Sequence, residues 1–139
     1  MTTIAGLIAA HDAAALAFGA PDREWMTYGN LRNLSASVGE VLHAAGIGRG
    51  DRVAIVLPNG PEMAAAFVSI AQWAVTAPLN PAYQEDEFAF YLDDLGAKAI
   101  VLGADDDGPA LAAAQRFGLS VLRLHAPADA PAGTFTLSA

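Results

Sequence analysis

The sequence predicts an α/β domain with a mostly parallel sheet and helices on both of its faces. Three observations lead to this fold class. Residues 53–57 (VAIVL) form a continuous apolar run, which is typical of a parallel strand buried on both sides. A turn, a helical pattern and a second short β-type segment follow in the order of a right-handed crossover. The same rhythm then repeats twice, through apolar strand segments at 99–102 and 121–124.

Two helices are expected before the central strand. Thr3 is suited to cap a first helix over residues 4–18, where apolar residues recur at helical spacing. Thr27 is suited to cap a second helix that ends near Ala45, and Gly46 can stop it in a left-handed conformation. The expected core-facing stripe of this second helix consists of Leu31, Leu34, Val38, Val41 and Leu42.

The helix after the central strand begins at a recognisable signal. Pro61 fits a first helical turn because its missing N–H costs nothing there, and Glu62 fits the positive end of the helix dipole. Its expected core face is formed by Met63, Phe67, Ile70 and Ala71, with small residues at 64–66 that allow a close approach to the sheet. A short strand is expected at 75–77.

A further helix is expected from the acidic start at 85–87 to Gly96, with a core side of Phe88, Tyr91, Leu92 and Leu95. A weaker helix follows at 109–117, with Gly118 as its stop. From these elements we expect one α/β subdomain over residues 1–126. The Ala-, Pro- and Gly-rich residues 127–139 are expected to be a linker or an edge strand, with 134–137 as the strand candidate.

Composition limits the partners. The net charge is −8 with only seven Lys and Arg, which argues against binding nucleic acid or an anionic membrane. The uncharged run at 63–79 is too short and too interrupted for a membrane span. The chain has no cysteine, which is compatible with the cytoplasm, where we expect it. Hydrophobic residues make up 54 %, so either both sheet faces are covered or apolar surface awaits a partner and drives self-association.

No catalytic, cofactor-binding or metal-binding residue is predicted. The glycines of GIGRG at 46–50 follow a helix, whereas a dinucleotide-binding loop follows a strand. The acidic run at 105–107 lacks the alternating spacing of a cation loop, and we expect it to cap a helix and face solvent. The isolated histidines and helical serines lack partners at ligand or nucleophile spacing: His11, His43, His125, Ser35, Ser37 and Ser69.

Several short segments, in order, resemble the opening of acyl-adenylate-forming enzymes, the superfamily of acyl-CoA synthetases and AMP-dependent ligases. They are MTY at 26–28, GI at 46–47, GDRVA at 50–54, LPN at 57–59 with Glu62, PLNP at 78–81, EDE at 85–87 and GAKA at 96–99. The resemblance covers about residues 3–124. Trp73, Ala71 and the segments at 82–83 and 88–92 look more like the oxalyl-CoA synthetase branch than the fatty-acid branch.

The resemblance implies the first lobe of the large N-terminal domain of a longer ligase. Such enzymes use ATP and Mg²⁺ to convert a carboxylic acid to an acyl-adenylate and then pass the acyl group to coenzyme A. Their phosphate loop, ribose-binding Asp and C-terminal lysine match no position here. We therefore expect a scaffold segment that needs the remainder of its polypeptide, binds none of these cofactors tightly alone and is inactive alone.

Two other readings remain open at this point. The chain could be a stand-alone α/β binding or interaction module that kept the scaffold without the chemistry. It could also be an unrelated flavodoxin-like nucleotide binder, with its ligand at the carboxyl ends of the strands near residues 58–61 and 81–84.

Overall fold

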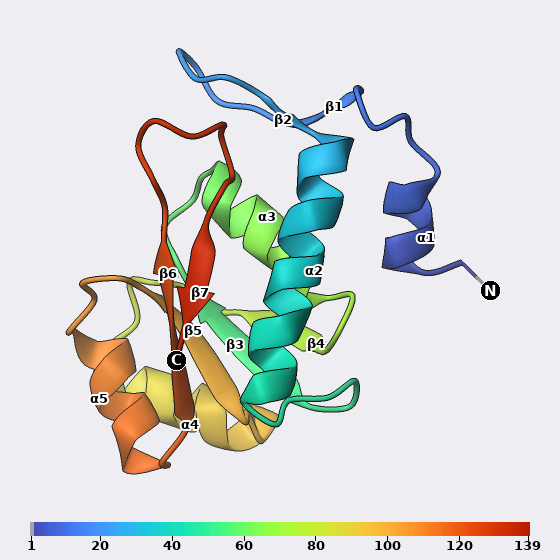
Figure 1. Ribbon diagram of the computed structural model, residues 1–139. Helices are drawn as coiled ribbons and strands as arrows, with labels where there is room; N and C mark the ends of the chain where they lie inside the picture. Colours follow the sequence, from blue (N-terminus) through green and yellow to red (C-terminus); the bar gives the residue numbers. More distant parts are fainter. Residues whose placement is uncertain (1) are drawn as a thin grey trace.

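The structure is a computed structural model that describes residues 2–139. It contains a five-stranded sheet between two layers of helices and a separate two-stranded ribbon (Figure 1). The helices are α1 (Ile4–Ala9), α2 (Tyr28–Ala44), α3 (Pro61–Ile70), α4 (Glu85–Leu95) and α5 (Pro109–Arg116). The strands are β1 (Leu16–Phe18), β2 (Met26–Thr27), β3 (Arg52–Val56), β4 (Val75–Pro78), β5 (Ala99–Gly103), β6 (Ser120–His125) and β7 (Thr136–Ser138).

The large sheet has the strand order β4-β3-β5-β6-β7. The first four of these strands are parallel, and β7 runs antiparallel to β6. From β3 the chain steps outward to β4 and then crosses back to β5 on the other side of β3. This reversal is the arrangement of a doubly wound α/β sheet, so the predicted fold class is confirmed.

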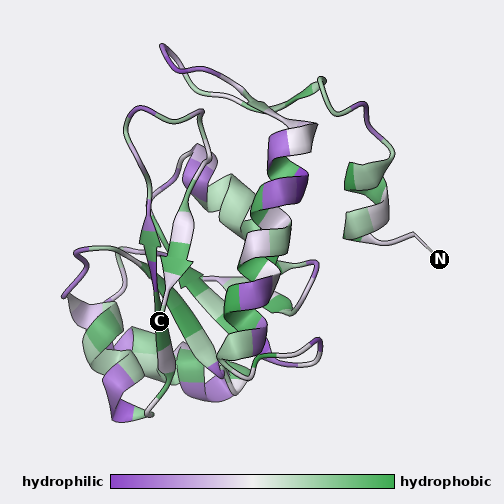
Figure 2. Cartoon of the chain, in the orientation of Figure 1, coloured by the Kyte–Doolittle hydropathy of each residue, from purple (hydrophilic) through white to green (hydrophobic). Residues whose placement is uncertain are grey.

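Both faces of the sheet are covered, as the continuous apolar runs predict. Val53 and Ile55 of β3 belong to the core under α2 and α3, whereas Ala54 and Val56 belong to the core under α4 and α5. Successive side chains of a strand point to opposite faces, so a strand buried on both sides must be apolar at every position. Figure 2 shows the resulting hydrophobic strands in the interior, with hydrophilic residues in loops and on outer helix surfaces.

The predicted helix signals are confirmed at four positions. The Thr27 side chain accepts from the Asn30 N–H at 3.1 Å at the start of α2. Gly46 and Gly96 follow α2 and α4 with φ of 77° and 60°, a region that side-chain-bearing residues avoid. Pro61 opens α3, where its lack of an N–H costs no hydrogen bond.

The first predicted helix is wrong beyond residue 9. The helix α1 ends at Ala9, and Leu16–Phe18 form β1, which pairs with β2. Asp12 accepts from the Ala14 N–H at 3.1 Å, a local turn that competes with helix continuation. Arg32 of α2 donates to the carbonyl groups of Ile8, Ala9 and His11 and so holds the chain where α1 ends.

Two predicted core faces need correction. On α3, Phe67 is 39 % exposed, while Ala65 and Ala66 are fully buried against the sheet. Small side chains permit the closest helix–sheet approach, so the alanines rather than the aromatic ring face inward. On α4, Tyr91 is 36 % exposed, and the core contacts come from Phe88, Ala89 and Leu92.

The C-terminal residues pack onto the same body. Ala132 and Phe135 are buried, and the Ala132 N–H donates to the Glu24 carbonyl at 2.8 Å. β7 overlaps the predicted strand at residues 134–137 and extends one residue beyond it, to Ser138. It is an edge strand of the sheet. Within residues 2–139, no helix is both long enough and apolar enough to cross a bilayer.

Candidate functional site

A cavity of about 560 Å³ lies where β3 and β4 end, on the side where doubly wound sheets bind ligands. Its polar side chains are two amides, Asn59 and Asn80. The Asn80 side-chain oxygen already accepts from the Ala82 N–H at 2.9 Å, so it serves the loop. The lining holds no basic group that could pair with a phosphate. The complete lining is Leu57, Asn59, Met63, Pro78, Leu79, Asn80, Pro81 and Ala82.

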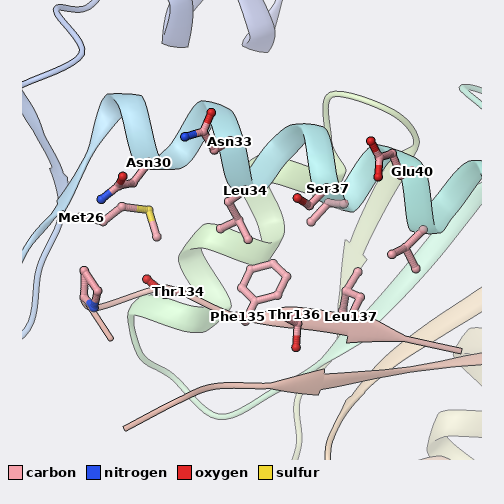
Figure 3. Close-up of a pocket in the computed structure, with 13 residues that line it drawn as sticks. Met26, Asn30, Asn33, Leu34, Ser37, Glu40, Thr134, Phe135, Thr136 and Leu137 are labelled. Atoms are coloured by element: carbon pink, nitrogen blue, oxygen red, sulfur yellow. The ribbon is translucent and has the colours of Figure 1, made fainter. Parts of the chain in front are cut away.

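A second cavity, also of about 560 Å³, is an elongated apolar groove between α2 and the C-terminal segment (Figure 3). We call it the α2–β7 groove. Leu34 and Val41 of α2, predicted as core residues, are only half-buried because they form its upper wall. The complete lining is Met26, Asn30, Asn33, Leu34, Ser37, Val38, Glu40, Val41, Pro131, Thr134, Phe135, Thr136 and Leu137.

One polar network holds the far wall of this groove. Glu62, at the start of α3, accepts from Arg23 at 3.1 and 3.3 Å and from the Gly133 N–H at 2.8 Å. Arg23 also donates to the carbonyl oxygens of Ala130 and Pro131. Glu62 therefore does more than complement the helix dipole, since it ties three chain segments together. No sequence signal announced this, because 39 and 71 positions separate Glu62 from its partners.

Trp73 joins α2 to the loop before β4. Its indole N–H donates to the Ser35 carbonyl at 2.9 Å, and its ring meets His43 edge-on. The neighbouring Gln72 donates to the Ser35 hydroxyl at 2.7 Å. Ser35 is thus a buried packing residue whose hydroxyl is occupied as an acceptor.

The isolated histidines and the acidic run lie apart from one another and have structural roles. His11 stacks on Tyr28, and the His125 ring lies 3.2 Å from the Ser138 hydroxyl. In the acidic run, Asp106 accepts from the Gly108 N–H at 3.0 Å just before α5. Among residues 2–139, no three His, Cys, Asp or Glu side chains converge as metal ligands.

One carboxylate has a shifted pKa. Asp51 accepts from the Gly48 N–H at 2.7 Å and lies 3.3 Å from the Lys98 ammonium group. The backbone hydrogen bond first, and then Lys98, hold the pKa of Asp51 below its ordinary value of 3.8. Lys98 also donates to the Gly46 carbonyl at 2.6 Å, so this group fastens the end of α2 to the start of β3.

The comparison with protein families gives a match over most of the chain. A family described as AMP-binding enzyme matches residues 8–134. The chain belongs to this family. The resemblance seen in the short sequence segments is therefore confirmed, and the sheet described above is the corresponding part of the family's α/β scaffold.

Several relatives of this chain are named as CoA ligases. A probable CoA ligase, CCL9, from Humulus lupulus is 34 % identical over 78 % of this chain and 20 % of its own length. The oxalate–CoA ligase of Arabidopsis thaliana is 34 % identical over 68 % of this chain and 19 % of its own. This chain thus spans about a fifth of the length of these two relatives.

A comparison with solved structures also finds a similar fold. ATP-bound MatB from Rhodopseudomonas palustris superimposes with a TM-score of 0.71 and 28 % identity, over 81 % of this chain and 23 % of that chain. The reading as an unrelated flavodoxin-like nucleotide binder is therefore wrong. The sheet is doubly wound, but it belongs to the AMP-binding enzyme family.

Proposed function

We propose that this chain forms the N-terminal scaffold segment of an ATP-dependent carboxylate–CoA ligase. The ligase would convert a small carboxylic acid to an acyl-adenylate and then to an acyl-CoA. The observation that carries the proposal is the family match over residues 8–134, together with relatives named as CoA ligases. These comparisons favour this function over the stand-alone interaction module.

The proposed role of the segment is structural. Its residues do not fit ATP or Mg²⁺: the strand-end cavity lacks a basic side chain, and the described residues bring no set of metal ligands together. A phosphate chain needs backbone nests, Lys or Arg, and a cation to offset its charge. ATP, Mg²⁺ and coenzyme A would therefore be held by the remainder of the ligase, while residues 1–126 support it and residues 127–139 lead toward it.

A more specific proposal concerns the acid that the ligase activates. Trp73 and the aromatic segment at 88–92 resemble the oxalyl-CoA synthetase branch, and the match to the Arabidopsis oxalate–CoA ligase is in line with this. The CoA ligase CCL9 from Humulus lupulus has the same 34 % sequence identity to this chain, and its name specifies no acid. Sequence identity alone therefore does not distinguish between the branches. An activity profile of the longer ligase that excluded small dicarboxylates would remove the branch assignment.

The test is ATP–pyrophosphate exchange by the purified 139-residue chain with Mg²⁺ and a panel of acids that includes oxalate and malonate. We expect exchange at background level and no tight ATP binding by calorimetry. The oxalate–CoA ligase of Arabidopsis thaliana, assayed with oxalate, is the positive control. Robust exchange by this chain alone would overturn the scaffold proposal.

Two further properties belong to this proposal. A ligase that consumes ATP and coenzyme A would work in the cytoplasm. The chain alone should self-associate, because 54 % of its residues are hydrophobic and several large apolar side chains are exposed, among them Leu7, Leu16 and Phe90 at 56 %, 59 % and 64 %. Sedimentation velocity over a concentration series checks this, and a concentration-independent monomer would contradict it.

A further inference from the structure

The α2–β7 groove lies beside an open edge of the sheet. Among the described residues β7 pairs only with β6, so its other edge offers backbone N–H and C=O groups without a strand partner. Such an edge is a template for one more strand. Of the strands in this sheet, β7 is the one that α2 contacts most extensively, and Figures 1 and 3 show the helix running alongside β7.

The groove also has few charged side chains compared with the rest of the chain. Glu40 is the single charged residue among its 13 lining residues, although the whole chain has 22 charged residues, seven basic and 15 acidic. Phe135 and Leu137 form its floor, and polar residues of α2, Asn30 and Ser37 among them, form its rim. An apolar floor with a polar rim is the composition of a protein–protein contact rather than of a phosphate site.

We propose that this groove receives one extended strand from the rest of the ligase, which pairs with the free edge of β7. Alternate apolar side chains of that strand would point between α2 and Phe135, and the intervening ones would face away. The proposal rests on the proposed function. The rest of the ligase is long enough to supply this strand, because about four-fifths of the length of the two relatives lies outside the part that this chain matches. In addition, β7 is the last strand of this chain and lies beside the groove.

A second copy of this chain fits the groove less well. Two β7 strands paired about a two-fold axis would lie about 5 Å apart, and each would bring its own α2 to the same face. Packed helices need about 8–10 Å between their axes. Since α2 lies against β7 itself, two α2 helices would collide, whereas a single added strand meets no second helix.

The test extends the 139-residue chain after Ala139 by an Asn-Gly turn and a short strand of alternating Val and Thr. Hydrogen exchange of the β7 amides is measured by NMR with and without the extension. We expect the outward amides of β7 to exchange at least about tenfold more slowly when the strand is present. An extension of the same length with Pro at alternate positions, which cannot donate to the ladder, should give no protection.

A matched pair of variants ties the effect to the groove. Ser37 and Ala36 are adjacent exposed residues of α2, and only Ser37 lines the groove. Ser37→Arg should therefore abolish the protection, and Ala36→Arg should leave it intact. Unchanged β7 exchange, or protection that survives Ser37→Arg, would overturn the proposal. So would self-association of the unextended chain that Ser37→Arg abolishes, because a second copy would then be the occupant.

The source of the strand has its own check. In the ATP-bound MatB structure, a strand from outside the part matched by this chain should lie at pairing distance from the counterpart of β7. An open groove there would overturn the assignment to the rest of the ligase. None of these measurements uses catalytic activity, so their failure is distinguishable from a failure of the proposed function in the exchange assay.

Discussion

The indole of Trp73 packs directly on Gly39, in the middle of α2. A Cβ placed at Gly39 would lie 2.6 Å from Cε2 of Trp73, closer than real side chains approach. The indole N–H bond to the Ser35 carbonyl, one helical turn earlier, fixes the ring in this position. Position 39 therefore requires glycine because of an aromatic ring 34 positions away, and not because of backbone conformation.

Gly39→Ala should destabilise the fold by about 1–3 kcal/mol, because the added methyl group forces α2 and Trp73 apart. Urea unfolding at neutral pH measures the change. Gly50→Ala is the control, since a Cβ there meets nothing within 4 Å, and it should stay within about 0.5 kcal/mol.

The same substitution should change sign when the ring is removed. In a Trp73→Gly background, Gly39→Ala should stabilise by up to about 1 kcal/mol, because alanine is the better helix former and no longer clashes. A double-mutant cycle measures this coupling. A cost that stayed the same in both backgrounds would show that the ring is not its source.

Glu62→Gln should cost about 1–2 kcal/mol, because the carboxylate joins Arg23 to the Gly133 N–H and both donors lose a charged acceptor. Both side chains of the ion pair are only about a quarter exposed, at 26 % and 24 %. Glu85→Gln removes a pair with Arg116 that is about half exposed and should cost less than about 0.5 kcal/mol. Equal effects in denaturant unfolding would contradict the structural role of Glu62.

Gly133→Ala should cost more than Gly118→Ala. Both glycines have left-handed backbones, with φ of 88° and 63°, so both substitutions strain the chain by about 1 kcal/mol. Only at Gly133 would the Cβ press on neighbours, the Ala65 methyl group and the Pro61 carbonyl oxygen at 3.3 Å. Thermal unfolding of the two variants isolates this close approach, and equal midpoints would show that it is unimportant.

Acid should loosen the contact between α2 and β3. Because the folded pKa of Asp51 is depressed, its contribution to stability is present above its ordinary pKa of 3.8 and is lost as pH falls through the lower folded pKa. Asp51→Asn should therefore flatten the part of the stability curve below about pH 4. Urea midpoints of both proteins between about pH 5 and pH 2 provide the comparison. Parallel curves would contradict the assignment.

Local signals were sufficient for most elements of the sheet. The apolar run of β3 predicted a strand buried on both faces, and Gly46, Pro61 and Gly96 marked helix ends correctly. The prediction failed where tertiary contacts decide between local alternatives. Residues 10–18 have the composition of a helix, yet the pairing of β1 with β2 and the hold of Arg32 on the end of α1 outweigh that preference.

The sequence by itself determined the fold class and the family of this protein, because periodicity, turn residues and short segments are local properties of the chain. Only the tertiary structure decided which apolar side chains remain partly exposed in a groove. Leu34 and Val41 look like core residues in any helical pattern, but their burial depends on what lies across from α2. That neighbour is β7, about a hundred positions away, and it leaves the α2–β7 groove partly unfilled. Contacts between such distant segments produce no periodic pattern in the sequence.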